Sequence, residues 1–170
     1  MGYNSRMNAG AVGKLDTAAT KAYLAGLLDG DGAISATIER HPQKKFGFRV
    51  RVEIKLTQKD DRLLRSLARE FKCGVISCNR KRDSDYSTHD WIIRDKNDCI
   101  RVLEYIGPYT RLKKRQTVLA LKILRGTIVT RKDLIKYAQV ADTLARFNVR
   151  SKNRRKNFVS MIQASISSND

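Results

Sequence analysis

The chain has 170 residues, enough for one compact domain with its own hydrophobic core and too few for a large multidomain enzyme. It carries 35 Lys and Arg against 17 Asp and Glu, which gives a formal net charge of +18 at pH 7. A surface this basic favours a polyanionic partner.

The remaining composition argues against disorder, membrane insertion and disulfides. Hydrophobic residues make up 41% of the chain and recur periodically, so we expect most of it to fold. The apolar stretch at 22–28 is too short to span a bilayer, and residues 1–14 lack the apolar core of a signal peptide. Cys73, Cys78 and Cys99 lack paired CxxC spacing, so we expect reduced thiols in an intracellular protein. The compartment would be the cytoplasm in a prokaryote and otherwise an organelle or the nucleus.

Two hydrophobic periods alternate along the chain. A period near that of the α-helix predicts helices, and strict alternation predicts strands that bury one face. Asp16 or Thr17 caps the first helix, and Asp-Gly-Asp-Gly at 29–32 ends it. In chain order the predictions are a flexible leader at 1–14, a helix at 16–28, strands at 33–40 and 48–57, a helix at 60–72, strands at 75–79 and 88–94, and helices at 98–106, 112–125, 131–147 and 158–166. This order predicts an α+β domain at 15–149 with one antiparallel sheet, followed by a basic segment and C-terminal helix at 150–170 that are either part of the same domain or an extension of it.

The end of the first helix violates two local rules. Gly26 lies inside the helix, where glycine costs about 1 kcal/mol relative to alanine. With Ala22 and Gly30 it forms a ridge of small residues that lets a second backbone approach closely. Asp29 and Asp31 lie at the C-terminal end of this predicted helix, where the helix macrodipole disfavours negative charge by roughly 0.3 to 1 kcal/mol each. Such violations indicate a functional site, and a hard divalent cation would stabilise carboxylates placed there.

A solvated turn is the plainer interpretation of the Asp-Gly-Asp-Gly sequence. However, residues 24–32, Leu-Ala-Gly-Leu-Leu-Asp-Gly-Asp-Gly, resemble the LAGLIDADG motif of the homing endonucleases. The predicted order of elements over 16–147 is similar to the αββαββα core of that family. Two further strings resemble its single-motif members, Leu-Thr-Gln-Lys at 56–59 and Arg-Leu-Lys-Lys-Arg-Gln at 111–116. The resemblance implies the homing endonuclease fold, with a saddle-shaped DNA-binding sheet, of the intron-encoded type.

The resemblance also implies metal-dependent hydrolysis of phosphodiesters. Asp31, the last acid of the motif, would bind Mg²⁺ or Mn²⁺, with the Gly30 carbonyl as a further ligand. Gln58 would orient the attacking water, while Lys113 and Arg62 would stabilise charge near the scissile phosphate. The last three side chains each have a plainer interpretation, as helix-terminal, solvated or simple phosphate-contacting residues.

Because the chain holds one motif, the resemblance implies a homodimer that supplies one carboxylate for each DNA strand. We expect the first helices of two protomers to pair through Ala22, Ala25, Gly26 and Asp29, with both Asp31 side chains near the two-fold axis. Asp29 would also support the end of its helix. The implied partner is double-stranded DNA with a long pseudo-palindromic target.

The polar faces of the predicted strands supply candidates for reading the target. In the first hairpin these are Ser35, Thr37, Glu39, Arg49, Arg51, Glu53 and Lys55, with His41 at the strand end. In the second hairpin they are Ser77, Asn79 and Asp90, whereas we expect Trp91 in the core. Arginine suits guanine edges and glutamate suits cytosine amino groups, although a solvated polar face is the plainer interpretation. Counted from Ala33 to His41, a strand of nine residues extends about 30 Å, so one protomer would cover roughly nine base pairs and a dimer roughly eighteen to twenty.

Three functions compete on such a fold: a site-specific endonuclease that promotes intron homing, an intron RNA-splicing maturase, and a DNA-binding regulator that has lost cleavage. Asp31, Gln58 and Lys113 together favour the endonuclease, because a maturase need not retain Asp31 and a regulator gains nothing from a metal site. A maturase would add intron RNA to the partners. The run at 150–156 holds five basic residues and no acid. It is either a nuclear localisation signal or, as we favour, a contact to flanking phosphates.

Overall fold

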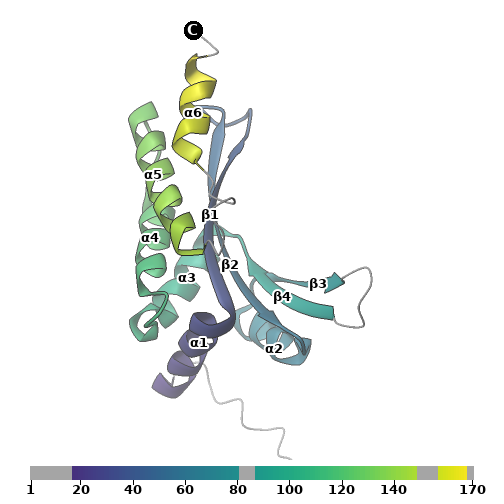
Figure 1. The fold of residues 1–170 in the computed structure, drawn as a ribbon. Helices are drawn as coiled ribbons and strands as arrows, with labels where there is room; N and C mark the ends of the chain where they lie inside the picture. The colour runs from purple at the N-terminus through teal and green to yellow at the C-terminus, as the bar shows by residue number, and fades with distance from the viewer. Residues whose placement is uncertain (1–16, 81–86, 149–156, 168–170) are drawn as a thin grey trace, which may run out of the picture.

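The sheet is the centre of the architecture. The structure is a computed structural model that describes residues 17–80, 87–148 and 157–167. Four antiparallel strands, β1 (Gly32–Arg40), β2 (Phe48–Gln58), β3 (Val75–Arg80) and β4 (Ser87–Ile93), lie in the spatial order β1-β2-β4-β3. The β1–β2 and β3–β4 hairpins diverge in Figure 1, so the sheet is strongly bent. The predicted α+β class is confirmed, while the predicted leader and the basic run at 150–156 lie outside the described residues.

Helices pack on one side of this sheet and leave the opposite side open. They are α1 (Ala18–Asp31), α2 (Asp61–Phe71), α3 (Lys96–Ile106), α4 (Lys114–Arg125), α5 (Arg131–Asn148) and α6 (Phe158–Ser167), with a 3-10 turn η1 (Gly107–Tyr109). Figure 1 shows α1, α3, α4 and α5 on the same side, and α5 packs along β1. None of the helices in the described ranges combines the length and apolar character that crossing a membrane requires.

Side-chain caps begin several of these helices, and three of them illustrate the pattern. Thr17 accepts a hydrogen bond from the Thr20 N–H at the start of α1, and Asp60 accepts one from the Arg62 N–H at the start of α2. Asp95 accepts two N–H bonds at the start of α3. Such caps satisfy amide donors that have no partner inside the helix, which is why these boundaries were predictable from polar residues in the sequence.

The end of α1 was predicted too early. The helix does not stop at Leu28 but continues through Asp31, and the Gly32 N–H closes it on the Leu28 carbonyl before β1 begins directly. A side chain at Gly32 would force the backbone to shift, because its Cβ would lie 2.6 Å from the Leu28 carbonyl oxygen. Asp29, Gly30 and Asp31 therefore form the last helical turn rather than a loop.

The alternation seen in the sequence divides the sheet into two faces. The face under the helices buries Ile34, Ala36, Ile38, Val52, Ile54, Leu56, Trp91 and Ile93. Trp91 is in the core as predicted, and its indole N–H donates to the Cys73 carbonyl at 2.9 Å. Burial of the apolar face fixes the register, so the intervening side chains all point to the opposite, open side.

Thiol chemistry offers a test of this packing. Cys73 and Cys99 are buried free thiols, and burial raises the pKa of Cys73 to about 11 and that of Cys99 to about 12. Cys78 on β3 is exposed. We expect N-ethylmaleimide at neutral pH to modify the folded protein only at Cys78, and the denatured protein at all three thiols, as measured by intact mass. A Cys78→Ser variant is the control, and rapid modification of that folded variant would contradict the packing.

Candidate functional site

Asp29 joins two helices that are distant in sequence. Its carboxylate accepts hydrogen bonds from the backbone N–H groups of Arg111 at 2.7 Å, Leu112 at 3.1 Å and Lys113 at 2.9 Å. These amides precede α4, whose own N-cap residue supplies no side-chain cap. The positive end of α4 thus stabilises a carboxylate that the dipole of α1 disfavours.

Lys113 adds a second link between the same helices. Its ammonium Nζ donates to the Asp29 backbone carbonyl at 2.5 Å, at the end of α1 where carbonyls lack intrahelical donors. A cation in this position also interacts favourably with the negative end of the helix dipole. We call these contacts of Asp29 with residues 111–113 the Asp29 clasp.

Asp31 is exposed and meets Gln58 from the sheet. Gly32 and Leu56 are partners in the β1–β2 register, which brings the end of β2 beside the end of α1. The Gln58 amide Nε2 donates to Asp31 Oδ2 at 2.7 Å. Because the amide nitrogen is used in this contact, the Gln58 Oε1 atom is left as an acceptor.

These groups fit a divalent cation. The Asp31 carboxylate and the Gly30 carbonyl, in the last turn of α1, are hard oxygen donors of the kind that Mg²⁺ and Mn²⁺ bind. Within residues 17–80, 87–148 and 157–167, no cluster of three or more His, Cys, Asp or Glu side chains could hold a metal alone. Further oxygen ligands would therefore come from water, from a phosphate or from a second protomer.

Arg62 is turned to a different partner. Its guanidinium Nε hydrogen-bonds to both carboxylate oxygens of Asp60, at 2.8 and 3.0 Å, at the start of α2. This side-chain hydrogen bond lowers the pKa of Asp60 to about 2 and raises the pKa of Arg62. The structure therefore brings together Asp31 with Gln58 and Asp29 with Lys113, but it joins Arg62 to Asp60.

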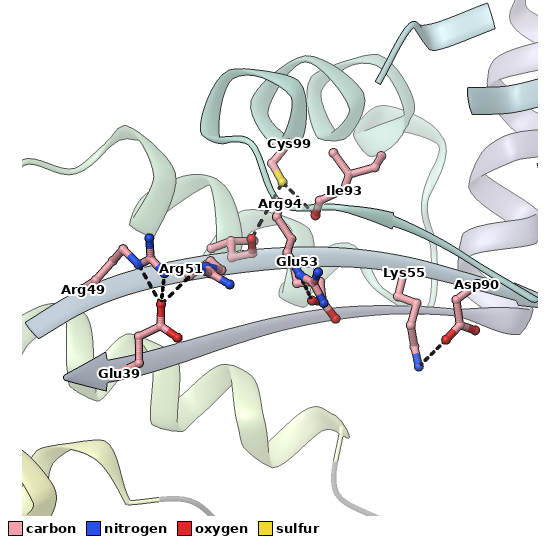
Figure 2. Close-up of polar contacts among 10 residues, drawn as sticks. Glu39, Arg49, Arg51, Glu53, Lys55, Asp90, Ile93, Arg94 and Cys99 are labelled. Carbon is pink, nitrogen blue, oxygen red and sulfur yellow. Dashed lines mark hydrogen bonds and ion pairs between the residues drawn. The ribbon is translucent and has the colours of Figure 1, made fainter. Parts of the chain in front are cut away.

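The open face of the sheet carries the polar residues predicted for the first hairpin. Ser35 lies opposite Glu53, Thr37 opposite Arg51, and Glu39 opposite Arg49. Figure 2 shows that the acids on this face are ion-paired. The pairs are Glu39 with Arg49 at 2.6 Å and with Arg51 at 3.0 Å, Glu53 with Arg94 at 2.7 Å, and Lys55 with Asp90 at 3.4 Å. Each acid thus orients a cation, and these pairs engage one carboxylate oxygen each of Glu39 and Glu53.

The second hairpin continues the open face in the predicted orientation but changes the role of one residue. Thr57, Asp90 and Ser77 are successive partners across β2, β4 and β3. Asp90, however, is only 4% exposed. Its carboxylate accepts hydrogen bonds from Thr57 Oγ1 and Asn79 Nδ2, both at 2.6 Å. The prediction that Asp90 contacts a base is corrected, because its neighbours cover it.

Sequence reasoning missed several residues on this face. Val75 and Ile92 are partners in the β3–β4 register, and Val75 is exposed, so the open face includes an apolar pair. Polarity was the criterion for choosing candidates, which excluded these two and also overlooked Thr57. His41, predicted at the strand end, lies in the turn, where its N–H donates to the Gly47 carbonyl at 2.8 Å. It lines a cavity of about 420 Å³ between this turn, α5 and α6.

The exposed face of α1 differs in part from the predicted dimer surface. Ala22, Gly26 and Gly30 are exposed, and a Cβ at either glycine would meet nothing within 4 Å. Ala25 is 0% exposed because its side chain packs in the core of its own protomer, so it is excluded from this surface. Asp29 is half-buried, and its carboxylate is engaged in the Asp29 clasp.

Two large apolar side chains accompany the small residues of α1. Tyr23 on the same helix is 57% exposed, and Leu112, beside the Asp29 carboxylate, is 77% exposed. Exposed apolar side chains that cluster around a ridge of small residues are typical of protein–protein contacts. Leu112 was not among the residues predicted for the dimer surface, because its place depends on the Asp29 clasp.

Comparisons with known proteins agree with this geometry. The family model for LAGLIDADG endonucleases matches residues 24–123. The chain is 30% identical over 131 residues to DNA endonuclease I-CreI of Chlamydomonas reinhardtii, covering 74% of this chain and 77% of that protein. Among solved structures, I-CvuI in complex with its target in the presence of Ca superposes with a TM-score of 0.73 at 23% identity, over 88% of this chain and 94% of that one. The homing endonuclease I-TnaI superposes with a TM-score of 0.69 at 25% identity, over 84% and 97% of the two chains.

The Asp29 clasp generates a stability prediction. Asp29→Ala removes an acceptor from three backbone N–H groups, so we expect the free energy of unfolding to fall by about 2 kcal/mol. Asp29→Asn retains one acceptor oxygen and should lose less. Urea unfolding at one fixed protein concentration measures both values. An alanine variant as stable as the wild type would show that the clasp contributes nothing.

Proposed function

The chain belongs to the LAGLIDADG endonuclease family, and from this premise we propose that it is a metal-dependent homing endonuclease that hydrolyses both strands of a specific DNA duplex. The observation that carries the proposal is the contact of Asp31 with Gln58, where the end of α1 meets the open face of the sheet. A carboxylate poised for a cation thus adjoins a polar surface wide enough for a major groove. The activity is of the kind that promotes intron homing.

Each residue has a defined part in the proposed hydrolysis. Asp31 and the Gly30 carbonyl would hold a divalent cation, Mg²⁺ or Mn²⁺, which would supply activation of a water and neutralisation of phosphate charge. Gln58 would orient the attacking water, because its Oε1 can accept a hydrogen bond from that water while Nε2 donates to Asp31. Lys113, held at the end of α1, stabilises charge near the scissile phosphate.

Arg62 has a weaker claim to this site. Its bond to Asp60 would have to break before its guanidinium could reach a phosphate. Both side chains are exposed, so this ion pair costs little to exchange for a phosphate contact. We therefore keep Arg62 as a phosphate contact that forms only on DNA.

We propose a homodimer as the active unit. One Asp31 per protomer supplies one carboxylate, whereas cutting both strands needs two. The exposed ridge of Ala22, Gly26 and Gly30 supports pairing of two α1 helices, with Tyr23 and Leu112 covering its edges. Pairing along the two-fold axis would bring both Asp31 side chains, at the ends of α1, toward the centre of one DNA site.

The proposed target follows from the strand lengths. β1 has nine residues, so it extends about 30 Å and follows roughly nine base pairs. Two protomers would then read a pseudo-palindrome of roughly eighteen to twenty base pairs. Because β1 starts beside Asp31 and β2 ends at Gln58, the polar residues at these strand ends would read base edges near the cut, and those toward the β1–β2 turn the outer part of each half.

Replacement of Asp31 tests the proposed chemistry. We expect Asp31→Asn to lower the rate of cleavage of a selected target by about a hundredfold or more in Mg²⁺, because the amide no longer holds the cation by charge. Binding to the same duplex in Ca²⁺ should change far less. Asp98→Asn, which removes a carboxylate on α3, is the matched control and should cut normally. Full cleavage by the Asp31→Asn variant would refute the assignment.

The dimer has its own test. Gly26→Leu should fold normally, because a Cβ at Gly26 meets nothing within 4 Å inside the protomer. The added side chain would nevertheless hold the two α1 helices apart, so we expect dimerisation at least about tenfold weaker, as measured by sedimentation. Gln139→Leu adds the same side chain on the exposed face of α5 and should not alter assembly. A wild-type protein that is monomeric both free and on DNA would overturn the proposed dimer.

A further inference from the structure

Asp90 is an unusual residue for an open, polar sheet face. Among the described residues it is the one acidic side chain that is buried, and it lies under the surface that faces away from the helices. Three side chains surround it on this face: Thr57 directly opposite on β2, Lys55 diagonally on the same strand, and Asn79 diagonally on β3. Figure 2 shows the Lys55 ammonium directed at the Asp90 carboxylate.

The carboxylate is ionised despite its burial. Burial alone would raise the pKa of Asp90, but hydrogen bonds from Thr57 and Asn79 and the charge of Lys55 outweigh it and hold the pKa below its ordinary value. An ionised carboxylate accepts hydrogen bonds and donates none. Every neighbour that touches it must therefore present a donor to it.

This constraint fixes what the neighbours present to the groove. Thr57 has one hydroxyl proton, and it is donated to Asp90 at 2.6 Å, so the hydroxyl oxygen is left as an acceptor. Asn79 donates Nδ2 to Asp90 at 2.6 Å, which leaves its Oδ1 atom as an acceptor on an exposed residue. Lys55 stays a donor, because two of its three ammonium protons are not directed at Asp90. The cluster therefore offers two acceptors and one cation.

We propose that Asp90 is a specificity-determining residue that does not itself contact DNA. It makes Thr57 and Asn79 present acceptors to the groove, and these acceptors then select bases with exocyclic amino groups. This inference rests on the proposed function and extends it to the base class that is read. In the major groove, only adenine N6 and cytosine N4 present donors. Guanine and thymine would bring acceptors against the Thr57 and Asn79 acceptors, which leaves these two side chains unpaired.

The position of the cluster indicates which base pairs it reads. Thr57 directly precedes Gln58, whose amide contacts Asp31. The selected bases should therefore lie in the inner part of each half-site, close to the cut, and appear at a symmetric pair of positions because the proposed dimer reads the target twice.

Selection of bound duplexes from a randomised library, in Ca²⁺ so that no cleavage is needed, tests the inference. The wild type should enrich adenine or cytosine over guanine and thymine by about tenfold at inner positions. In Asp90→Asn, the new amide both donates and accepts, so Thr57 and Asn79 are free to present donors. We expect the preference at those inner positions to fall by about tenfold or to reverse toward guanine or thymine, with the outer positions unchanged.

A second variant keeps the inference falsifiable if Asp90→Asn fails to fold. Thr57→Val removes one acceptor and keeps the Asp90 carboxylate. It should erase the base preference at the position that Thr57 contacts. Thr57→Ser, which keeps the hydroxyl, is the matched control and should retain the preference. An unchanged profile in Asp90→Asn or Thr57→Val, or a uniform loss of affinity across all positions, would overturn the role of Asp90.

The same experiment separates this inference from the proposed function. If the wild type enriches a long symmetric sequence but the variants do not alter its inner positions, the endonuclease proposal stands and the role of Asp90 falls. If the wild type enriches no sequence at all, site-specific recognition itself is refuted, and the inference that rests on it falls with it.

Discussion

The Asp29 clasp is the contact on which the rest of the candidate site depends. α1 ends against the sheet, and its final turn carries a carboxylate that its own dipole disfavours. The amides before α4 satisfy that carboxylate, and Lys113 satisfies the adjoining carbonyl. With the helix end fixed from both sides, Asp31 is held at the edge of the sheet beside Gln58, and Leu112 is displayed next to the small-residue ridge. The placement of both the cation ligand and the proposed dimer surface thus follows from one set of backbone contacts.

The distribution of charge separates affinity from recognition. On the open face, the four cations Arg49, Arg51, Lys55 and Arg94 are paired with the three acids Glu39, Glu53 and Asp90, so this surface is nearly neutral. By contrast, the segment 111–125 contains six basic residues and no acid, and the chain as a whole has a net charge of +18. Contacts to phosphates supply most of the affinity of DNA-binding proteins, whereas base edges supply specificity. An open face with nearly equal numbers of acids and cations suits base recognition, and the basic segments elsewhere in the chain suit phosphate contacts.

The sequence was sufficient for the features that depend on local periodicity. The strand alternation predicted which side of the sheet is buried, and it placed Ser77, Asn79 and Asp90 on the same face. What failed was set by contacts between distant segments. The end of α1 was placed at Leu28 because Asp-Gly-Asp-Gly is typical of a turn, but the amides at 111–113 stabilise another turn of helix. Ala25 was assigned to the dimer surface from the motif alone, although tertiary packing buries it completely.

The three acids Asp29, Asp31 and Asp90 show how environment, rather than residue type, divides their roles. Asp29 receives backbone amides and Asp90 receives side-chain donors, so both oxygens of each carboxylate already have protein partners. Asp31 is exposed and has one amide partner, which occupies a single carboxylate oxygen. A hard cation pays a smaller desolvation cost at such a carboxylate than at one already surrounded by protein donors. The same comparison explains why a buried acid suits recognition. An ionised carboxylate held in place requires each neighbouring side chain to donate a hydrogen bond to it, so the neighbours present their acceptor atoms to the base edge.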